Sequence, residues 1–197
     1  MPLVNHLLIQ NLFTDKFSYA IGLGIGQNLL SMGARSIDVN DFAQAIKDVL
    51  EGNKTAISHN EAREIVNKYF TELEEKINAE NIEKGKAFLE ENKKNPHIVT
   101  LPSGLQYEVI TEGNGNKPKA TDRVRCHYEG TLIDGTLFDS SIKRGEQAVF
   151  GVNQVIKGWV EALQLMSEGA KWKLYIPSDL AYGAQGAGEM IPPHSTL

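Results

Sequence analysis

Apolar residues recur at helical spacing along the first half of the chain, and the first such stretch spans residues 17–32. It is mostly apolar and contains three glycines, of which Gly22 and Gly26 lie one turn apart on the same face. Because glycine costs a helix about 1 kcal/mol relative to alanine, this pattern indicates a helix that a second helix approaches closely. A loosely helical core segment is the alternative.

A second amphipathic pattern runs from Asp38 to Leu50, with Asp38 suited to begin the helix and Gly52 to end it. A region with two such short helices rarely folds alone without a disulfide or a partner. We therefore expect residues 1–57 to be a helical dimerisation region whose core is completed by a second subunit. The apolar positions of this second pattern are Val39, Phe42, Ala43, Ile46, Val49 and Leu50.

The longest helical pattern extends from Ser58 to Asn95. Ser58 and Glu61 have the spacing of a capping box, and a proline follows the last residue. At ~1.5 Å per residue an unbroken helix would be about 54 Å long. Its apolar stripe thins along the way, so we expect a packed first half and a solvated second half. Residues 58–96 are predicted to be a long linking helix, with a two-piece helix broken near Gly85 as the alternative.

After a hinge at 96–104 with two prolines and a glycine, the pattern changes to short alternating strands. Asp134-Gly135, between two runs of strand formers, predicts a hairpin, and one short helix is predicted at 158–166. Residues 97–197 should therefore form an antiparallel half-barrel sheet that wraps a short helix, and the chain as a whole is α+β. Strands are predicted at 105–110, 124–128 and 171–176.

Composition and charge exclude several classes of partner. The chain is 41% hydrophobic with a net charge of -5 and mixed acids and bases, so it has no basic surface for nucleic acid. No stretch approaches the ~18 to 20 apolar residues that cross a membrane. Cys126 stands alone, which excludes an intrachain disulfide and a multi-cysteine zinc site. We interpret it as a small buried strand residue.

The N-terminus lacks the basic region, apolar run and small-residue cleavage site of a secretion signal. We therefore expect a cytoplasmic protein, or a periplasmic or surface protein if the natural chain starts earlier. The residues before Thr14 resemble an added apolar turn or lead.

The second half of the chain lacks the usual catalytic groups. Ser140 and Ser141 lie near His127 in sequence, but no nucleophile-elbow motif surrounds them. The histidines are scattered, and the glycines at 183–188 lack the Lys-Ser/Thr of a phosphate loop, so we interpret that segment as a mobile loop. We expect no metal and no cofactor.

What remains is a group of large aromatic rings near one carboxylate. Asp139 is the acid, and Val155 and Ile156 are apolar neighbours. An ordinary aromatic core is the alternative interpretation. The rings belong to Tyr128, Phe138, Phe150, Trp159 and Tyr182.

Four segments that contain most of these residues resemble those of a known enzyme family. The segments HYEGTLIDGTLFDSS, VIKGW, LAYG and IPPHSTL occur in the order and at the spacings of FKBP-type peptidyl-prolyl isomerases, over about residues 102–197. The N-terminal half, with SYAIGLGIGQNL and the long helix, resembles the dimeric bacterial branch that includes the macrophage infectivity potentiator. The resemblance implies a peptidyl-prolyl cis-trans isomerase that acts during protein folding, holds unfolded chains, binds macrolide inhibitors and forms a homodimer through its N-terminal helices.

The resemblance also implies a role for each pocket residue. Trp159 is similar to the indole floor, Tyr128 to the pocket tyrosine that bonds near the acid, and Phe138-Asp139 to the family's FD pair. Tyr182 matches the tyrosine hydroxyl on the loop. The implied catalytic residues are Tyr128, Phe138, Asp139, Trp159 and Tyr182, and the implied substrate-binding residues are Arg144, Phe150, Val155, Ile156 and the far wall Ile191.

One departure from the family pattern concerns the end of the sequence. The family continues past its STL segment into a last strand with another pocket phenylalanine, whereas this sequence ends at Leu197. We therefore expect the isomerase domain to lack a central strand and one pocket wall.

Elementary chemistry agrees with this activity. Rotation of an X-Pro bond needs no proton transfer, only passage over a resonance barrier of about 18 to 20 kcal/mol. The twisted amide has lost resonance and polarity, so a dry aromatic pocket favours it over the planar amide. Turnover near 10² per second requires on the order of 5 kcal/mol of this preference. The rival hypotheses are a binding module for proline peptides or macrolides without catalysis, and rings buried for structure alone.

Overall fold

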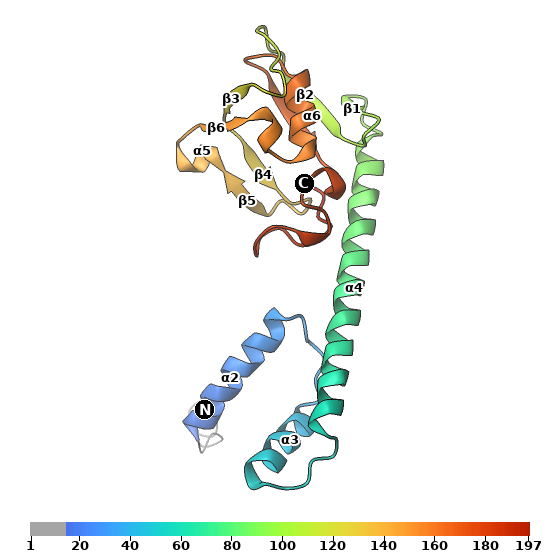
Figure 1. Cartoon of the computed structure of the whole chain (residues 1–197), viewed down its shortest axis with the longest axis vertical. Coiled ribbons are helices and arrows are strands. Elements are labelled where there is room, and N and C mark those ends of the chain that lie inside the picture. The colour runs from blue at the N-terminus through green and yellow to red at the C-terminus, as the bar shows by residue number, and fades with distance from the viewer. Residues whose placement is uncertain (1–14) are drawn as a thin grey trace, which may run out of the picture. The chain divides into compact units, whose positions relative to one another are not determined.

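The computed structural model describes residues 15–197, and the chain divides into two compact units at Leu73/Glu74, inside its longest helix (Figure 1). The boundaries expected from sequence, at 57/58 and 96/97, stay a prediction. No helix among residues 15–197 is long and apolar enough to cross a membrane.

Among residues 15–197, the first two helices are those predicted from sequence, α2 (Lys16–Ser31) and α3 (Val39–Glu51). Asp38 accepts hydrogen bonds from the backbone N–H groups of the second and third residues after it, at 2.8 and 3.1 Å, and so caps α3. Gly52 ends α3 with a left-handed φ of 69°. These local signals fixed the bounds of α3 to within one residue.

The long helix α4 (His59–Asn92) is continuous through Gly85, so the two-piece alternative is wrong. The Ser58 hydroxyl accepts from the Glu61 N–H at 3.2 Å, as the capping box predicted. The helix ends before Asn95 because the last turn tightens: the Asn95 N–H donates to the Asn92 carbonyl three residues back, at 3.1 Å.

The two halves of α4 differ in burial, in the opposite sense to the prediction. Gly85, in the second half, is the buried residue of the helix. Ile65, Val66 and Tyr69, in the first half, are each at least 40% exposed in the single chain. In the single chain the second half is therefore the more covered one, against the prediction, and its covered face combines apolar with small and polar residues: Asn81, Ile82, Gly85, Phe88, Leu89 and Asn92.

The C-terminal unit contains three small antiparallel sheets, as the alternating pattern predicted. One sheet has the order β1-β2-β7, from β1 (Ile98–Thr100), β2 (Gln106–Thr111) and β7 (Lys171–Tyr175). The β1 strand lies inside the segment that the sequence indicated as a hinge. The other pairs are β3 (Arg123–Cys126) with β6 (Ala148–Gly151), and β4 (Glu129–Thr131) with β5 (Leu137–Ser140).

The predicted hairpin joins β4 to β5. Gly135 has a φ of 88°, which favours glycine, and the Asp134 side chain accepts from the Thr136 N–H at 2.9 Å. The hairpin sets the register in which Gly130 lies opposite Asp139, and so it positions one acid of the candidate site.

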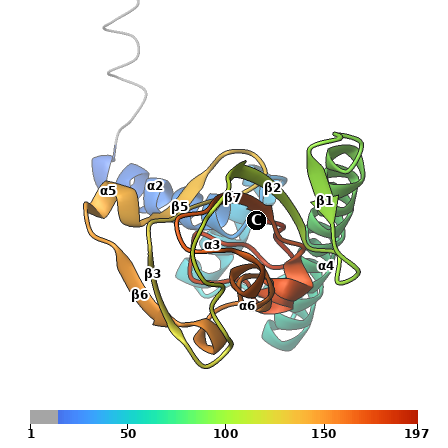
Figure 2. The same cartoon turned by 90° about the horizontal axis from the view of Figure 1, so that it is seen from above.

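The predicted short helix is α6 (Lys157–Leu165), which the views place between the β3–β6 ladder and β1 (Figure 2). Ala162 of α6 packs with Leu105 and Ile176 in the core, and Trp159 lies against this cluster. The remaining short elements are α5 (Ser141–Arg144) and the 3-10 turns Val152–Gln154, Ser178–Leu180 and Gly183–Gln185.

Candidate functional site

A cavity of about 740 Å³ opens in the C-terminal unit beside α6. Eight of the ten residues proposed from sequence line it: Tyr128, Phe138, Asp139, Phe150, Val155, Ile156, Trp159 and Tyr182. Arg144 does not line the cavity but bonds two residues that do. Ile191 is buried, at 5% exposure, outside the lining. Most of the residues predicted from sequence therefore share one cavity. The catalytic or substrate-binding role of each residue stays a prediction.

Three aromatic rings, centred on that of Trp159, form the floor of the cavity. The Trp159 ring meets the Tyr128 ring edge to face, with centroids 5.2 Å apart and planes at 88°. Its centroid lies 5.4 Å from that of Phe150. Such pairs fix the orientation of each ring, and the core beneath Trp159 holds the indole in place. The floor is therefore apolar, and packing on both sides holds the indole in one orientation.

Gly130 makes room for the Phe138 ring. A Cβ at position 130 would overlap the far end of that ring and lie 3.3 Å from another of its carbons. The bulge between Gly130 and Thr131 in the β4–β5 ladder bends the strand at this point. Any side chain at Gly130 would push the Phe138 ring into the cavity or out of it.

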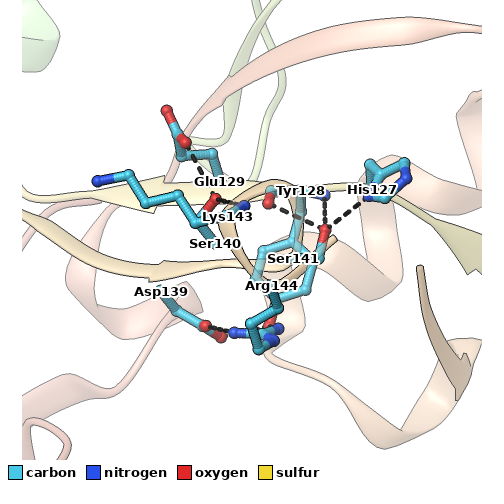
Figure 3. A network of polar contacts seen from close by, with 8 residues as sticks. All are labelled: His127, Tyr128, Glu129, Asp139, Ser140, Ser141, Lys143 and Arg144. Carbon is cyan, nitrogen blue, oxygen red and sulfur yellow. Dashed lines mark hydrogen bonds and ion pairs between the residues drawn. The ribbon is translucent and has the colours of Figure 1, made fainter. Parts of the chain in front are cut away.

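A hydrogen-bonded cluster surrounds the Asp139 carboxylate (Figure 3). The Tyr128 hydroxyl donates to Oδ2 of Asp139, and Arg144 donates to Oδ1 of the same carboxylate. A second guanidinium N–H of Arg144 donates to the Tyr128 hydroxyl at 3.2 Å. The Asp139 and Arg144 side chains are 37% and 51% exposed, so this ion pair lies at the mouth of the cavity.

The cluster fixes the charge of each member. Hydrogen bonds from Tyr128 and then Arg144 lower the pKa of Asp139, which remains a carboxylate at neutral pH. Burial, followed by the hydrogen bond to Asp139, raises the pKa of Tyr128, so its hydroxyl remains a neutral donor. No member of the cluster is suited to give up a proton near pH 7. The cluster supplies a fixed dipole beside the apolar floor.

Two serines that sequence analysis considered only as nucleophiles hold this cluster in place. Ser141 is fully buried; its hydroxyl accepts from the Tyr128 N–H at 2.7 Å and lies 3.2 Å from Nδ1 of His127 (Figure 3). Ser140 caps α5, the turn that carries Arg144, by accepting from the Lys143 N–H at 3.1 Å. A buried hydroxyl cannot reach a substrate, so Ser-His chemistry is excluded here. Two serines followed by basic residues are typical of a short capped helix, and this signal could have been recognised in the sequence.

Sequence analysis also missed the far part of the cavity. Its lining continues to α6 and β7 through Leu163, Met166, Trp172 and Leu174. Trp172 stacks on Tyr107, with ring centroids 4.1 Å apart. Trp172 and Leu174 are two residues apart on one strand, and this spacing was the signal for a shared face.

Apolar rings and a fixed dipole suit rotation about an amide better than bond cleavage. Among residues 15–197, no group of three or more His, Cys, Asp or Glu side chains could hold a metal ion. The rings and the dipole suit differential binding of a twisted X-Pro amide, whose carbonyl is less polar than that of the planar form. Fold and site together define a proline-isomerase pocket on an antiparallel sheet around one helix.

Comparisons with known proteins identify the family. Residues 114–197 match the pattern of the FKBP-type peptidyl-prolyl cis-trans isomerase, and residues 14–109 match the domain amino-terminal to it. The chain is 48% identical over 184 residues to the FKBP-type 22 kDa peptidyl-prolyl cis-trans isomerase of Escherichia coli (strain K12), covering 91% of this chain and 89% of that protein. It is 44% identical over 192 residues to the outer membrane protein MIP of Legionella longbeachae, covering 93% and 81%.

The fold agrees with a solved relative. The crystal structure of FkpA from Escherichia coli is similar with a TM-score of 0.74 at 33% identity, and the match covers 93% of each chain. This chain therefore belongs to the FKBP-type peptidyl-prolyl cis-trans isomerase family, and it is an enzyme of that class acting on proline-containing substrates. The predicted family and α+β fold are confirmed.

Proposed function

We propose that the chain accelerates X-Pro isomerisation in unfolded or partly folded proteins. The observation that carries this is the cavity itself: its floor is apolar, its polar cluster lies at one side, and Tyr182 at its edge is 41% exposed. Such a site recognises a proline ring and little of the residues around it, which suits many different clients.

The test is refolding of a protein whose slow step is proline isomerisation. Catalytic amounts of the chain should speed that step, because the uncatalysed rotation takes tens to hundreds of seconds. A Trp159→Leu variant serves as the control. Acceleration of a short peptide with no effect on refolding would limit the activity to accessible peptides and contradict the proposal.

We propose further that two copies of the chain join through their N-terminal helices. In the single chain, large apolar side chains of α2 and α3 remain uncovered: Phe17, Val39 and Leu50 are 74%, 72% and 81% exposed. A Cβ added at Gly22 or Gly26 would meet nothing within 4 Å. Open space beside small residues is what a closely packed second helix requires. Sedimentation should give a dimer, and a monomer at micromolar concentration would contradict the proposal.

A dimer would also hold its clients. Two cavities on one assembly raise the effective concentration of a bound chain at the second site. Removal of residues 1–57 should therefore reduce refolding activity more than turnover of a tetrapeptide. Equal losses in the two assays would show that holding plays no part.

Macrolide inhibitors are the proposed small-molecule ligands, because the cavity has the size and apolar lining of a drug-binding pocket. Quenching of tryptophan fluorescence on titration tests this. Trp159 and Trp172 both line the cavity, so the titration requires a Trp172→Phe variant to isolate the signal of the floor. No change in that signal would contradict binding at the floor.

We propose that the protein acts in the cytoplasm, with the periplasm or the cell surface as the alternative. Fractionation of cells that make the protein tests it, and recovery in a periplasmic or outer-membrane fraction would contradict it.

A further inference from the structure

The second half of α4 is packed against the isomerase unit along a row of residues at helical spacing. Phe88 lies with its ring centroid 6.0 Å from that of Tyr175 on β7. The buried Gln106 on β2 donates to the Leu89 carbonyl at 2.9 Å and accepts from the Asn92 amide at 2.9 Å. These contacts attach the last turns of α4 to the sheet beside the cavity.

One turn to three turns earlier, the same face contacts the last residues of the chain. The Asn81 amide donates to the Pro193 carbonyl at 3.0 Å. At Gly85, a Cβ would overlap the Thr196 hydroxyl and lie 3.3 Å from the Thr196 Cβ. Thr196 is 5% exposed and β-branched, so it has little freedom to move aside. Glycine at position 85 is what lets the helix and this segment touch.

The segment that α4 contacts is bonded directly to residues of the cavity. The His194 N–H donates at 2.8 Å to the carbonyl of Gly183, the neighbour of Tyr182. Leu197 and Ile176, which both line the cavity, exchange two backbone hydrogen bonds of 2.8 and 3.0 Å. A displacement of residues 193–196 would therefore also move Tyr182, through Gly183, and Leu197, and both of these residues line the cavity.

We propose that Asn81 and Gly85 are positioning residues for the isomerase reaction. Through residues 193–196 they fix Tyr182 and Leu197 at the wall of the cavity, so the second half of α4 is part of the catalytic unit rather than a spacer. Neither residue touches the substrate. The inference rests on the isomerase activity of the cavity and is independent of the proposed dimer and client binding.

The test is Gly85→Ala in the full chain, measured by peptide turnover. Helix propensity favours alanine at this position, so a merely helical role predicts unchanged activity in an equally or more stable protein. The proposal predicts a loss of about tenfold in kcat/KM, because small displacements of a site wall carry costs of this size. The loss should lie mainly in KM, since Tyr182 would contact the bound peptide before and during rotation. Asn81→Ala should show the same split with a smaller loss.

A double variant separates the contact from general damage. Gly85→Ala with Thr196→Ala removes the overlapping hydroxyl and should restore most of the lost kcat/KM. Lys84→Ala, at a side chain that is 65% exposed on the same helix, is the matched control and should match the wild type. Thermal melting follows the folded fraction of every variant.

Three results would overturn the proposal: unchanged KM in both Gly85→Ala and Asn81→Ala, a Gly85→Ala loss that the double variant does not restore, or a loss that only tracks the unfolded fraction. An inactive wild-type chain would instead contradict the isomerase activity itself, so the two failures are distinguishable.

Discussion

Replacing Trp159 by leucine tests whether the aromatic floor supplies the catalytic preference for the twisted amide. The substitution keeps an apolar side chain but removes the indole that Tyr128 and Phe150 contact at 5.2 and 5.4 Å. Each such aromatic pair contributes about 0.5 to 1.5 kcal/mol beyond the area it buries. Loss of both pairs would therefore remove about 1 to 3 kcal/mol of the interaction energy that organises the floor.

If that organisation acts on the transition state, kcat/KM falls by about five- to 150-fold, because each 1.36 kcal/mol is tenfold in rate. The assay is peptide turnover at a substrate concentration below KM, with near-ultraviolet circular dichroism to show that the variant is folded. Trp159→Phe keeps a ring and should lose less. Trp172→Leu is the matched substitution at the cavity tryptophan that stacks on Tyr107, and it should lose less than Trp159→Leu. A folded Trp159→Leu variant with wild-type kcat/KM would refute the reasoning.

Four further predictions concern the hydrogen-bonded cluster, the Phe138 ring and the assembly. Asp139→Asn removes the carboxylate that accepts from Tyr128 and should lower kcat/KM of the peptide by about tenfold, the cost of one hydrogen bond to a charged group at a partly exposed site; unchanged turnover would show that packing alone carries catalysis. Because the folded pKa of Asp139 is lowered, its contribution to stability is present above the ordinary aspartate pKa of about 3.9 and is lost as pH falls through the folded value; carbon NMR should give a titration midpoint below 3.9, and a midpoint at or above it contradicts the cluster. Gly130→Ala should displace the Phe138 ring and weaken peptide binding, seen as a higher KM, whereas a wild-type KM would show that the ring has other room. Leu50→Asp places a charge on the uncovered face of α3 and should convert the dimer to monomers in sedimentation without changing tetrapeptide turnover; a dimer that persists would exclude that face.

The sequence predicted the helix α3 and the β4–β5 hairpin well, because interactions within a few residues determine where each of them begins and ends. Asp38 and Gly52 determine α3 because a capping carboxylate and a left-handed glycine act within a few residues of themselves. The same holds for Asp134 and Gly135 in the hairpin. In the site, eight of ten predicted residues share one cavity because a family pattern already encodes which distant positions meet.

The sequence did not predict features whose partners lie far along the chain. The buried face of α4 contains Asn81 and Gly85, which do not register as an apolar stripe, and their partners occur more than 100 residues later. Ile191 was expected at the cavity wall; it is buried, pairs with Ala187 in a bridge and is not among the residues that line the cavity. Such contacts depend on tertiary packing, which periodicity does not report.

The central claim is that the cavity lowers the barrier to X-Pro rotation by favouring a twisted, less polar amide without proton transfer. The most direct measurement compares catalysed isomerisation of a short proline peptide in H₂O and in D₂O at matched acidity. The account predicts strong acceleration with equal rates in the two solvents, because no bond to hydrogen changes in the slow step. A marked slowing in D₂O, or the absence of acceleration in either solvent, would contradict it.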